Sequence, residues 1–111
     1  MKFFETRYGE GRGMEEVRLE TYQESLWAKA FGVETLEGLF DLTPGDQAVT
    51  RIDEAIYRFN HDPEPLRTLL DPADTRGLRG NRMVLEQMRS TLVSHSDATI
   101  SGLVNDVPPA P

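Results

Sequence analysis

The sequence has no cysteine, and it has few of the other side chains that commonly carry out catalysis. Without thiols the chain forms no disulfide bond, thiolate zinc site, iron–sulfur cluster or cysteine nucleophile. No apolar run approaches the ~20 residues that a membrane-spanning helix requires. The first residues soon reach a glutamate, which is not the pattern of a secretory signal. A cytoplasmic location is therefore the default expectation.

Positive charge is scarce in the first half of the chain. The net charge of −7 arises in residues 14–64, which carry twelve acids and four bases, whereas residues 65–111 carry five of each. This balance disfavours generic binding to the phosphate backbone of nucleic acids. An acidic surface can attract a basic partner, although a solvated acidic face that maintains solubility is the more ordinary interpretation.

What the sequence does contain is a repeated signal for helix starts, in which a capping residue is followed by proline. The signal occurs at Thr43-Pro44, Asp62-Pro63 and Asp71-Pro72. The first of these precedes the clearest helical segment, residues 44–59. Its apolar residues recur at the helical period and are expected to be buried. They are Val49, Ile52, Ile56 and Phe59.

Apolar periodicity predicts further helices elsewhere in the chain. The segments are 14–31, 33–42, 63–70, 81–95 and about 100–104. Between residues 71 and 82 a turn is expected, because Gly77 and Gly80 interrupt helical continuation. Strand-like alternation is scarce outside residues 2–8. The sequence therefore predicts an all-α fold, a compact bundle of five or six short helices.

Both ends of the chain are expected to lie outside this bundle. Residues 1–13 combine aromatic side chains with three glycines, which favours an arm or a short strand followed by a hinge. Residues 108–111 form a polyproline-like tail. The predicted organisation is an N-terminal arm, a single helical domain over residues 14–107, and the tail. We expect the two ends to mediate contacts rather than to stabilise the fold.

The two histidines lie in surroundings that favour structural roles. His61 stands where one predicted helix ends and the next begins, so capping accounts for the polar residues around it. His95 stands in Ser94-His95-Ser96-Asp97, which holds the residue types of a hydrolytic triad. Adjacent residues cannot converge as a triad requires, and a capped junction between two helices is the simpler interpretation. We predict no catalytic residue, no metal site and no cofactor.

Two features suggest contacts with a partner. The aromatic residues of the arm either fold back over the bundle or dock onto another chain. The segment Arg76–Arg82 places three arginines beside two glycines, so it is either an anion-binding loop or a flexible loop that pairs with acidic helices of its own domain. The candidates for partner contact are Phe3, Phe4, Tyr8, Arg76, Arg79 and Arg82.

The function that these features favour is a non-catalytic protein-interaction or assembly subunit, such as a structural component of a phage particle or another large complex. The alternative is an acidic inhibitor or regulator that binds a basic site on a partner protein. A small hydrolase or metalloenzyme ranks third, because no set of residues supports such a site. We expect protein partners, no direct nucleic-acid binding and no membrane association, in the cytoplasm or in a particle assembled there.

Overall fold

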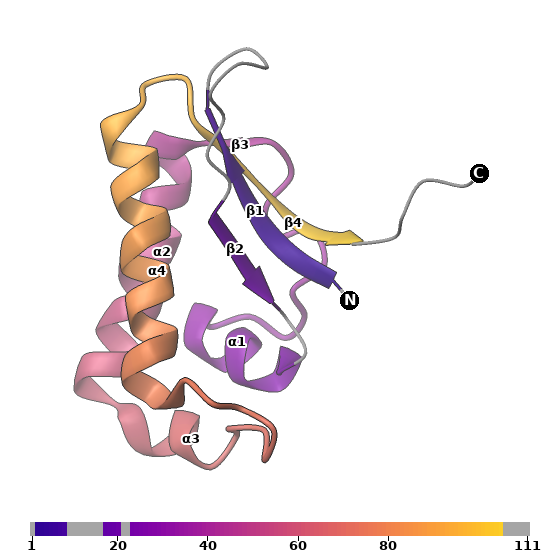
Figure 1. Cartoon of the computed structure of the whole chain (residues 1–111), viewed down its shortest axis with the longest axis vertical. Helices are drawn as coiled ribbons and strands as arrows, with labels where there is room; N and C mark the ends of the chain where they lie inside the picture. Colours follow the sequence, from indigo (N-terminus) through magenta and orange to yellow (C-terminus); the bar gives the residue numbers. More distant parts are fainter. Residues whose placement is uncertain (1, 9–16, 21–22, 106–111) are drawn as a thin grey trace.

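The computed structural model describes residues 2–8, 17–20 and 23–105 (Figure 1). Within these residues, four helices accompany a four-stranded antiparallel sheet, so the architecture mixes α and β structure. The expected all-α bundle of five or six helices is therefore wrong. The glycine-rich stretch after Tyr8 and the proline-rich tail, for which a hinge and a polyproline-like segment were expected, lie outside the described residues.

The sheet joins segments from both ends of the chain. Its strands pair in the order β2-β1-β4-β3. Their bounds are β1 Lys2–Arg7, β2 Val17–Glu20, β3 Thr43–Pro44 and β4 Thr99–Asn105. In the central pair, Phe3 of β1 lies opposite Val104 of β4, and Thr6 lies opposite Ile100. Of the two alternatives predicted for residues 1–13, an arm or a short strand, the short strand forms over Lys2–Arg7, and it lies inside the sheet.

The helices lie along one side and one end of the sheet (Figure 1). Their bounds are α1 Glu24–Phe31, α2 Gly45–His61, α3 Pro63–Arg67 and α4 Gly77–Ser94. The two longest, α2 and α4, pack against each other, and α4 also contacts β2 and β1. Helix α1 packs against α2 near the end of the sheet where β2 finishes. None of these helices combines the length and apolar character that crossing a membrane requires.

An aromatic cluster fills the space between the sheet and α1. The rings of Phe4, Phe31 and Phe40 meet edge to face, with centroids 5.4 to 5.7 Å apart. This geometry is favourable for aromatic pairs. Phe4 is fully buried, and a β-carbon built at Gly102 of β4 would stand only 2.8 Å from its ring. The absence of a side chain at Gly102 therefore leaves the space that Phe4 occupies.

The helix expected over residues 44–59 is confirmed as α2. Ile52 and Phe59 are buried as predicted, whereas Val49 and Ile56 are partly buried against the same core. The start of the helix differs in detail from the expectation. Thr43 belongs to β3, and its hydroxyl oxygen accepts from the Asp41 N–H at 3.1 Å instead of capping α2.

Three of the other predicted helices are wrong or only partly right. Within the described part of residues 14–31, 17–20 form a strand and only 24–31 are helical; residues 33–42 are irregular, and 100–104 belong to β4. Gly32 and Gly38 adopt left-handed conformations, with φ of 70° and 75°, which interrupt helix formation in the second segment. Both β2 and β4 pair with β1, and this pairing satisfies their backbone N–H and C=O groups. Apolar periodicity within one segment does not show that a distant partner strand exists.

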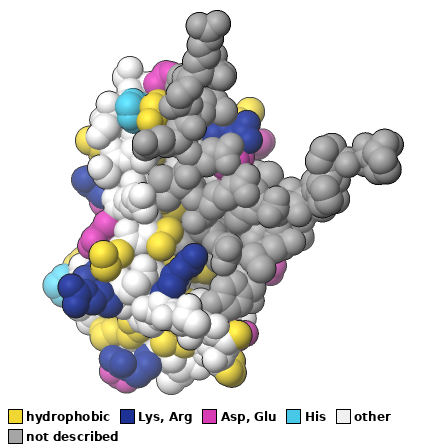
Figure 2. All heavy atoms as spheres, viewed as in Figure 1, with side chains coloured by type: hydrophobic (Ala, Val, Ile, Leu, Met, Phe, Trp, Pro, Cys, Tyr) yellow, Lys and Arg dark blue, Asp and Glu magenta, His cyan; other side chains and the backbone are white. Residues whose placement is uncertain are grey.

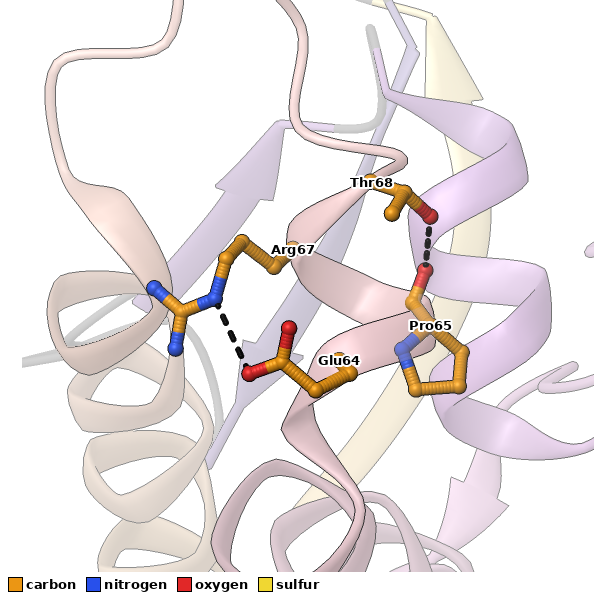
Figure 3. Close-up of polar contacts among 4 residues, drawn as sticks. All are labelled: Glu64, Pro65, Arg67 and Thr68. Carbon is orange, nitrogen blue, oxygen red and sulfur yellow. Dashed lines mark hydrogen bonds and ion pairs between the residues drawn. The ribbon is translucent and has the colours of Figure 1, made fainter.

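The second proline signal begins a helix and the third does not. Helix α3 starts at Pro63, although the Asp62 side chain makes no capping hydrogen bond. Its polar contacts are local: Arg67 Nε lies 3.3 Å from a Glu64 carboxylate oxygen, and the Thr68 hydroxyl donates to the Pro65 carbonyl at 2.9 Å (Figure 3). The segment from Asp71 forms a turn, in which the Asp71 carboxylate accepts from the Ala73 N–H at 2.8 Å. The turn expected over residues 71–82 is shorter than predicted, because α4 begins at Gly77 and continues through Gly80.

Candidate protein-binding groove

The outer surface of α2 carries a hollow. This hollow, which we call the α2 groove, has a volume of about 610 Å³ and opens to solvent. Its lining residues are Thr50, Asp53, Glu54, Tyr57, Arg58 and Asp62. Residues three or four apart lie on one face of a helix, so this spacing brings all of them onto a single surface.

Tyr57 is the exposed aromatic residue of the α2 groove. Its side chain is 62% exposed, although most aromatic residues of the described chain belong to the core. One turn further along α2, the ring of His61 lies 4.3 Å from the Tyr57 ring between centroids, at an interplanar angle of 30°. This contact orients the tyrosine ring without burying it. His61 is also the last residue of α2, the position that was expected for it.

The charges of the groove are unevenly neutralised. Asp53 is bound by Arg89 of α4, whose Nε lies 2.6 Å from a carboxylate oxygen. Among the residues that the structure describes, neither Glu54 nor Asp62 forms an ion pair. The groove therefore presents two carboxylates beside the tyrosine ring.

Arg58 separates the groove from a second hollow next to it. That hollow has a volume of about 400 Å³, lies against the end of α1, and shares Arg58 and Asp62 with the α2 groove. The Arg58 guanidinium donates from Nη1 to the Ala30 carbonyl at 2.7 Å, which satisfies an acceptor in the last turn of α1. Its charge also complements the negative end of the α1 dipole.

The aromatic residues predicted to contact a partner lie in the sheet or at its end. Phe4 is buried in the core, so its ring is not available at the surface. Tyr8 is partly buried and stacks on His95, with ring centroids 3.4 Å apart and planes within 5° of parallel. His95 therefore occupies the junction between α4 and β4, not a junction between helices. The side chain of Phe3 lies outside the described part of the structure, and its role stays a prediction.

Two of the three arginines predicted to contact a partner lie in a helix and not on a loop. Arg76 immediately precedes α4, whereas Arg79 and Arg82 lie within its first turns. Arg82 donates from Nη1 to the Asn60 side chain at 2.8 Å, and its Nε lies 3.4 Å from a Glu86 carboxylate oxygen, without hydrogen-bond geometry. On the face drawn in Figure 2, the described Lys and Arg side chains lie among hydrophobic and acidic ones. A partner contact through these arginines stays a prediction.

A partly buried polar cluster joins α1 to α4. The Asp74 carboxylate accepts from Gln23 Nε2 at 2.8 Å, from Asn81 Nδ2 at 3.1 Å and from the Gly77 N–H at 2.7 Å. Asn81 is fully buried, and Asn81 Oδ1 has no hydrogen-bond partner. Because these bonds tie the first turn of α4 to the residue before α1, the cluster orients the two helices.

Among the described residues, no group of three or more histidine, aspartate or glutamate side chains is placed to hold a metal ion. Sequence reasoning did not single out the α2 groove. The acidic stretch and the helix were both predicted, but the prediction for the helix concerned only its buried apolar face. The signal for the outer face was Tyr57, an aromatic residue that lies off the apolar stripe of an amphipathic helix.

Comparisons with protein-family models, curated proteins and solved structures find no match to this chain.

Proposed function

We propose that this protein is a non-catalytic protein-interaction subunit, and that it docks onto its partner through the α2 groove. The observation that carries the proposal is the exposed ring of Tyr57 beside a hollow of about 610 Å³. Tyrosine is enriched at protein interfaces because it combines a large apolar area with a polar tip and loses little conformational entropy. A partner side chain that enters the groove would remove this exposed ring from water.

The position of the groove supports the same role. It lies on α2, whose opposite face carries the fully buried Ala48, Ile52 and Ala55 of the core. A binding surface on a helix that is held by the core is rigid, so little ordering entropy is lost when a partner binds. The proposed location is the cytoplasm or a complex assembled there.

The test compares capture of partners by the full-length chain and by two variants. Tyr57→Ala removes the exposed ring of the groove, and Met83→Ala removes a 53% exposed apolar side chain of α4 as a matched control. We expect one partner to co-purify with the wild type and with Met83→Ala in equal amounts, and its recovery with Tyr57→Ala to fall at least about fivefold. Sedimentation velocity measures self-association in the same three proteins.

The outcomes test separately whether the protein binds a partner and whether it does so through the α2 groove. A partner or a self-associated form that survives Tyr57→Ala, with the melting temperature unchanged, would place the interface elsewhere on the molecule. If no specific partner and no self-association are found for the wild type, the proposed function is wrong.

A second candidate function is an acidic regulator that occupies a basic site on its partner, and the unpaired carboxylates of Glu54 and Asp62 favour it. The salt dependence of the complex distinguishes the two. Binding between opposite charges weakens steeply as salt screens them. An assembly interface with an apolar centre responds far less to salt.

A further inference from the structure

We infer that the α2 groove binds an extended, positively charged peptide segment of the partner, rich in arginine or lysine. This inference rests on the proposed docking through the α2 groove. Of the two candidate functions it takes the acidic regulator, whose binding weakens as salt is raised, and it specifies the chemistry of the partner. It has three components: the free carboxylates of the groove, the exposed tyrosine ring, and the length of the lined surface.

The carboxylates that remain for a partner are those of Glu54 and Asp62. The third acid of the groove, Asp53, is bound by Arg89 at 2.6 Å. The only base of the lining is Arg58, whose Nη1 bonds to the neutral Ala30 carbonyl at 2.7 Å and which keeps its positive charge. With three acids and one base, the lining is negative overall. An approaching cation thus meets two carboxylates whose charges no described ion pair neutralises. Phosphate groups of nucleic acids or lipids carry the same sign as these carboxylates and would be repelled.

The tyrosine ring adds an attraction that is specific for cations. A guanidinium or ammonium group within about 6 Å of an aromatic ring centroid is attracted by the ring quadrupole. Glu54 and Tyr57 are three residues apart on α2, so their side chains are neighbours on the helix surface. One arginine of the partner can therefore pair with Glu54 and contact the ring at the same time. A neutral apolar segment would leave both carboxylates without compensation.

The length of the groove determines the length of the segment. At a rise of about 1.5 Å per residue, the helix from Thr50 to Asp62 extends about 18 Å. An extended chain advances about 3.3 Å per residue, so five or six residues cover this distance. Side chains of an extended strand alternate, and every second residue would face the groove. The pattern of alternating basic residues is thus the best match.

The experiment uses a fluorescein-labelled hexapeptide of alternating arginine and glycine. A second hexapeptide replaces each arginine by citrulline, which has nearly the same shape and no charge. Fluorescence anisotropy measures the affinity of each peptide for the full-length protein. We expect the arginine peptide to bind, with an affinity that falls as salt is raised, and the citrulline peptide to bind at least about fivefold more weakly.

Four variants localise the binding. Glu54→Gln and Asp62→Asn each remove one carboxylate of the groove and should weaken binding of the arginine peptide about two- to fivefold. Tyr57→Leu retains apolar contact but removes the ring, with a similar expected loss. Glu37→Gln is the matched control, because it removes an exposed carboxylate that does not line the groove and changes the net charge by the same amount. It should change the affinity by less than about twofold.

Three results would overturn the inference. If Glu37→Gln weakens binding as much as Glu54→Gln, the peptide responds to the net charge of −7 and not to the groove. If the citrulline peptide binds as well as the arginine peptide, charge is not what the groove recognises. A natural partner that depends on Tyr57 but not on Glu54 or Asp62 would leave the proposed function intact and refute this inference alone.

Discussion

The guanidinium group of Arg58 occupies the space beside Gly32 in which a β-carbon would lie. A β-carbon built at Gly32 would stand 2.7 Å from Arg58 Nη2 and 2.9 Å from Nη1. Gly32 is the C-cap of α1, with φ of 70°, and its N–H bonds back to the Lys29 carbonyl. One glycine thus both ends α1 and leaves room for the arginine that connects α1 to α2.

Replacement of Gly32 by alanine should therefore destabilise the protein in two ways. The left-handed backbone costs about 1 to 2 kcal/mol for a residue with a β-carbon. The methyl group also displaces the Arg58 side chain, which removes its charge-assisted hydrogen bond to Ala30. We expect a loss of about 2 to 4 kcal/mol in the free energy of unfolding, measured by urea denaturation.

Gly38→Ala provides the control for this substitution. Gly38 has nearly the same backbone conformation, with φ of 75°, but a β-carbon there would meet no atom within 4 Å. Its replacement should cost only the backbone contribution, about 1 to 2 kcal/mol. Equal losses for Gly32→Ala and Gly38→Ala would show that the contact with Arg58 contributes nothing to stability.

Phe4→Ala should destabilise the protein by about 3 to 5 kcal/mol, because it removes a fully buried ring from the aromatic cluster. Thermal unfolding followed by circular dichroism measures the loss. Tyr57→Ala is the control, because an exposed ring contributes little to folding. A loss below about 1 kcal/mol for Phe4→Ala would mean that β1 does not pack against the core.

Asp74→Ala should cost about 2 to 4 kcal/mol. The carboxylate accepts from Gln23, Asn81 and the Gly77 N–H, and its removal leaves buried donors without acceptors. Asp41→Ala removes an exposed carboxylate and should change stability by less than about 0.5 kcal/mol. Denaturant unfolding of both variants gives the comparison, and equal effects would show that the polar cluster does not hold α4 in place.

The ion pair between Asp53 and Arg89 should contribute little to stability despite its short distance of 2.6 Å. Both side chains are more than two-fifths exposed, and pairs of this kind couple by about 0.2 to 1 kcal/mol. A double-mutant cycle with Asp53→Asn and Arg89→Gln measures the coupling, which should decrease as salt is added. A coupling above about 2 kcal/mol would show that the pair is shielded from solvent.

The part of the fold that could be predicted from sequence is the part determined by local pattern. The stripe containing Ile52 and Phe59 repeats over four turns, and α2 forms where that repeat lies. The alternation of Val17 to Glu20 is only four residues long, so it could not outweigh the helical spacing that also passes through Leu19. A strand so short is stabilised by its neighbour, and the neighbour cannot be found within the segment itself.

The sequence shows that the region of the candidate site is acidic, but it does not show where the groove forms. Acidic residues of the groove were counted within the acidic stretch, yet the sequence does not show which of them is neutralised. Asp53 meets Arg89 from a different helix, and Arg58 meets Ala30 from another. Such contacts depend on how α2 packs against α1 and α4. Burial of Phe4 was hidden for the same reason, since it depends on Gly102 at the far end of the chain.

The pairing of β1 with β4 has a consequence for the order in which the protein folds. Lys2 lies opposite Asn105, so nearly all of the chain described here intervenes between two adjacent central strands. Contacts between such distant residues carry a large loop-closure entropy and slow the folding reaction. During synthesis, β1 leaves the ribosome long before β4 exists. Until then, the edge of β1 that will pair with β4 has no partner strand, and it must be protected from pairing with other chains.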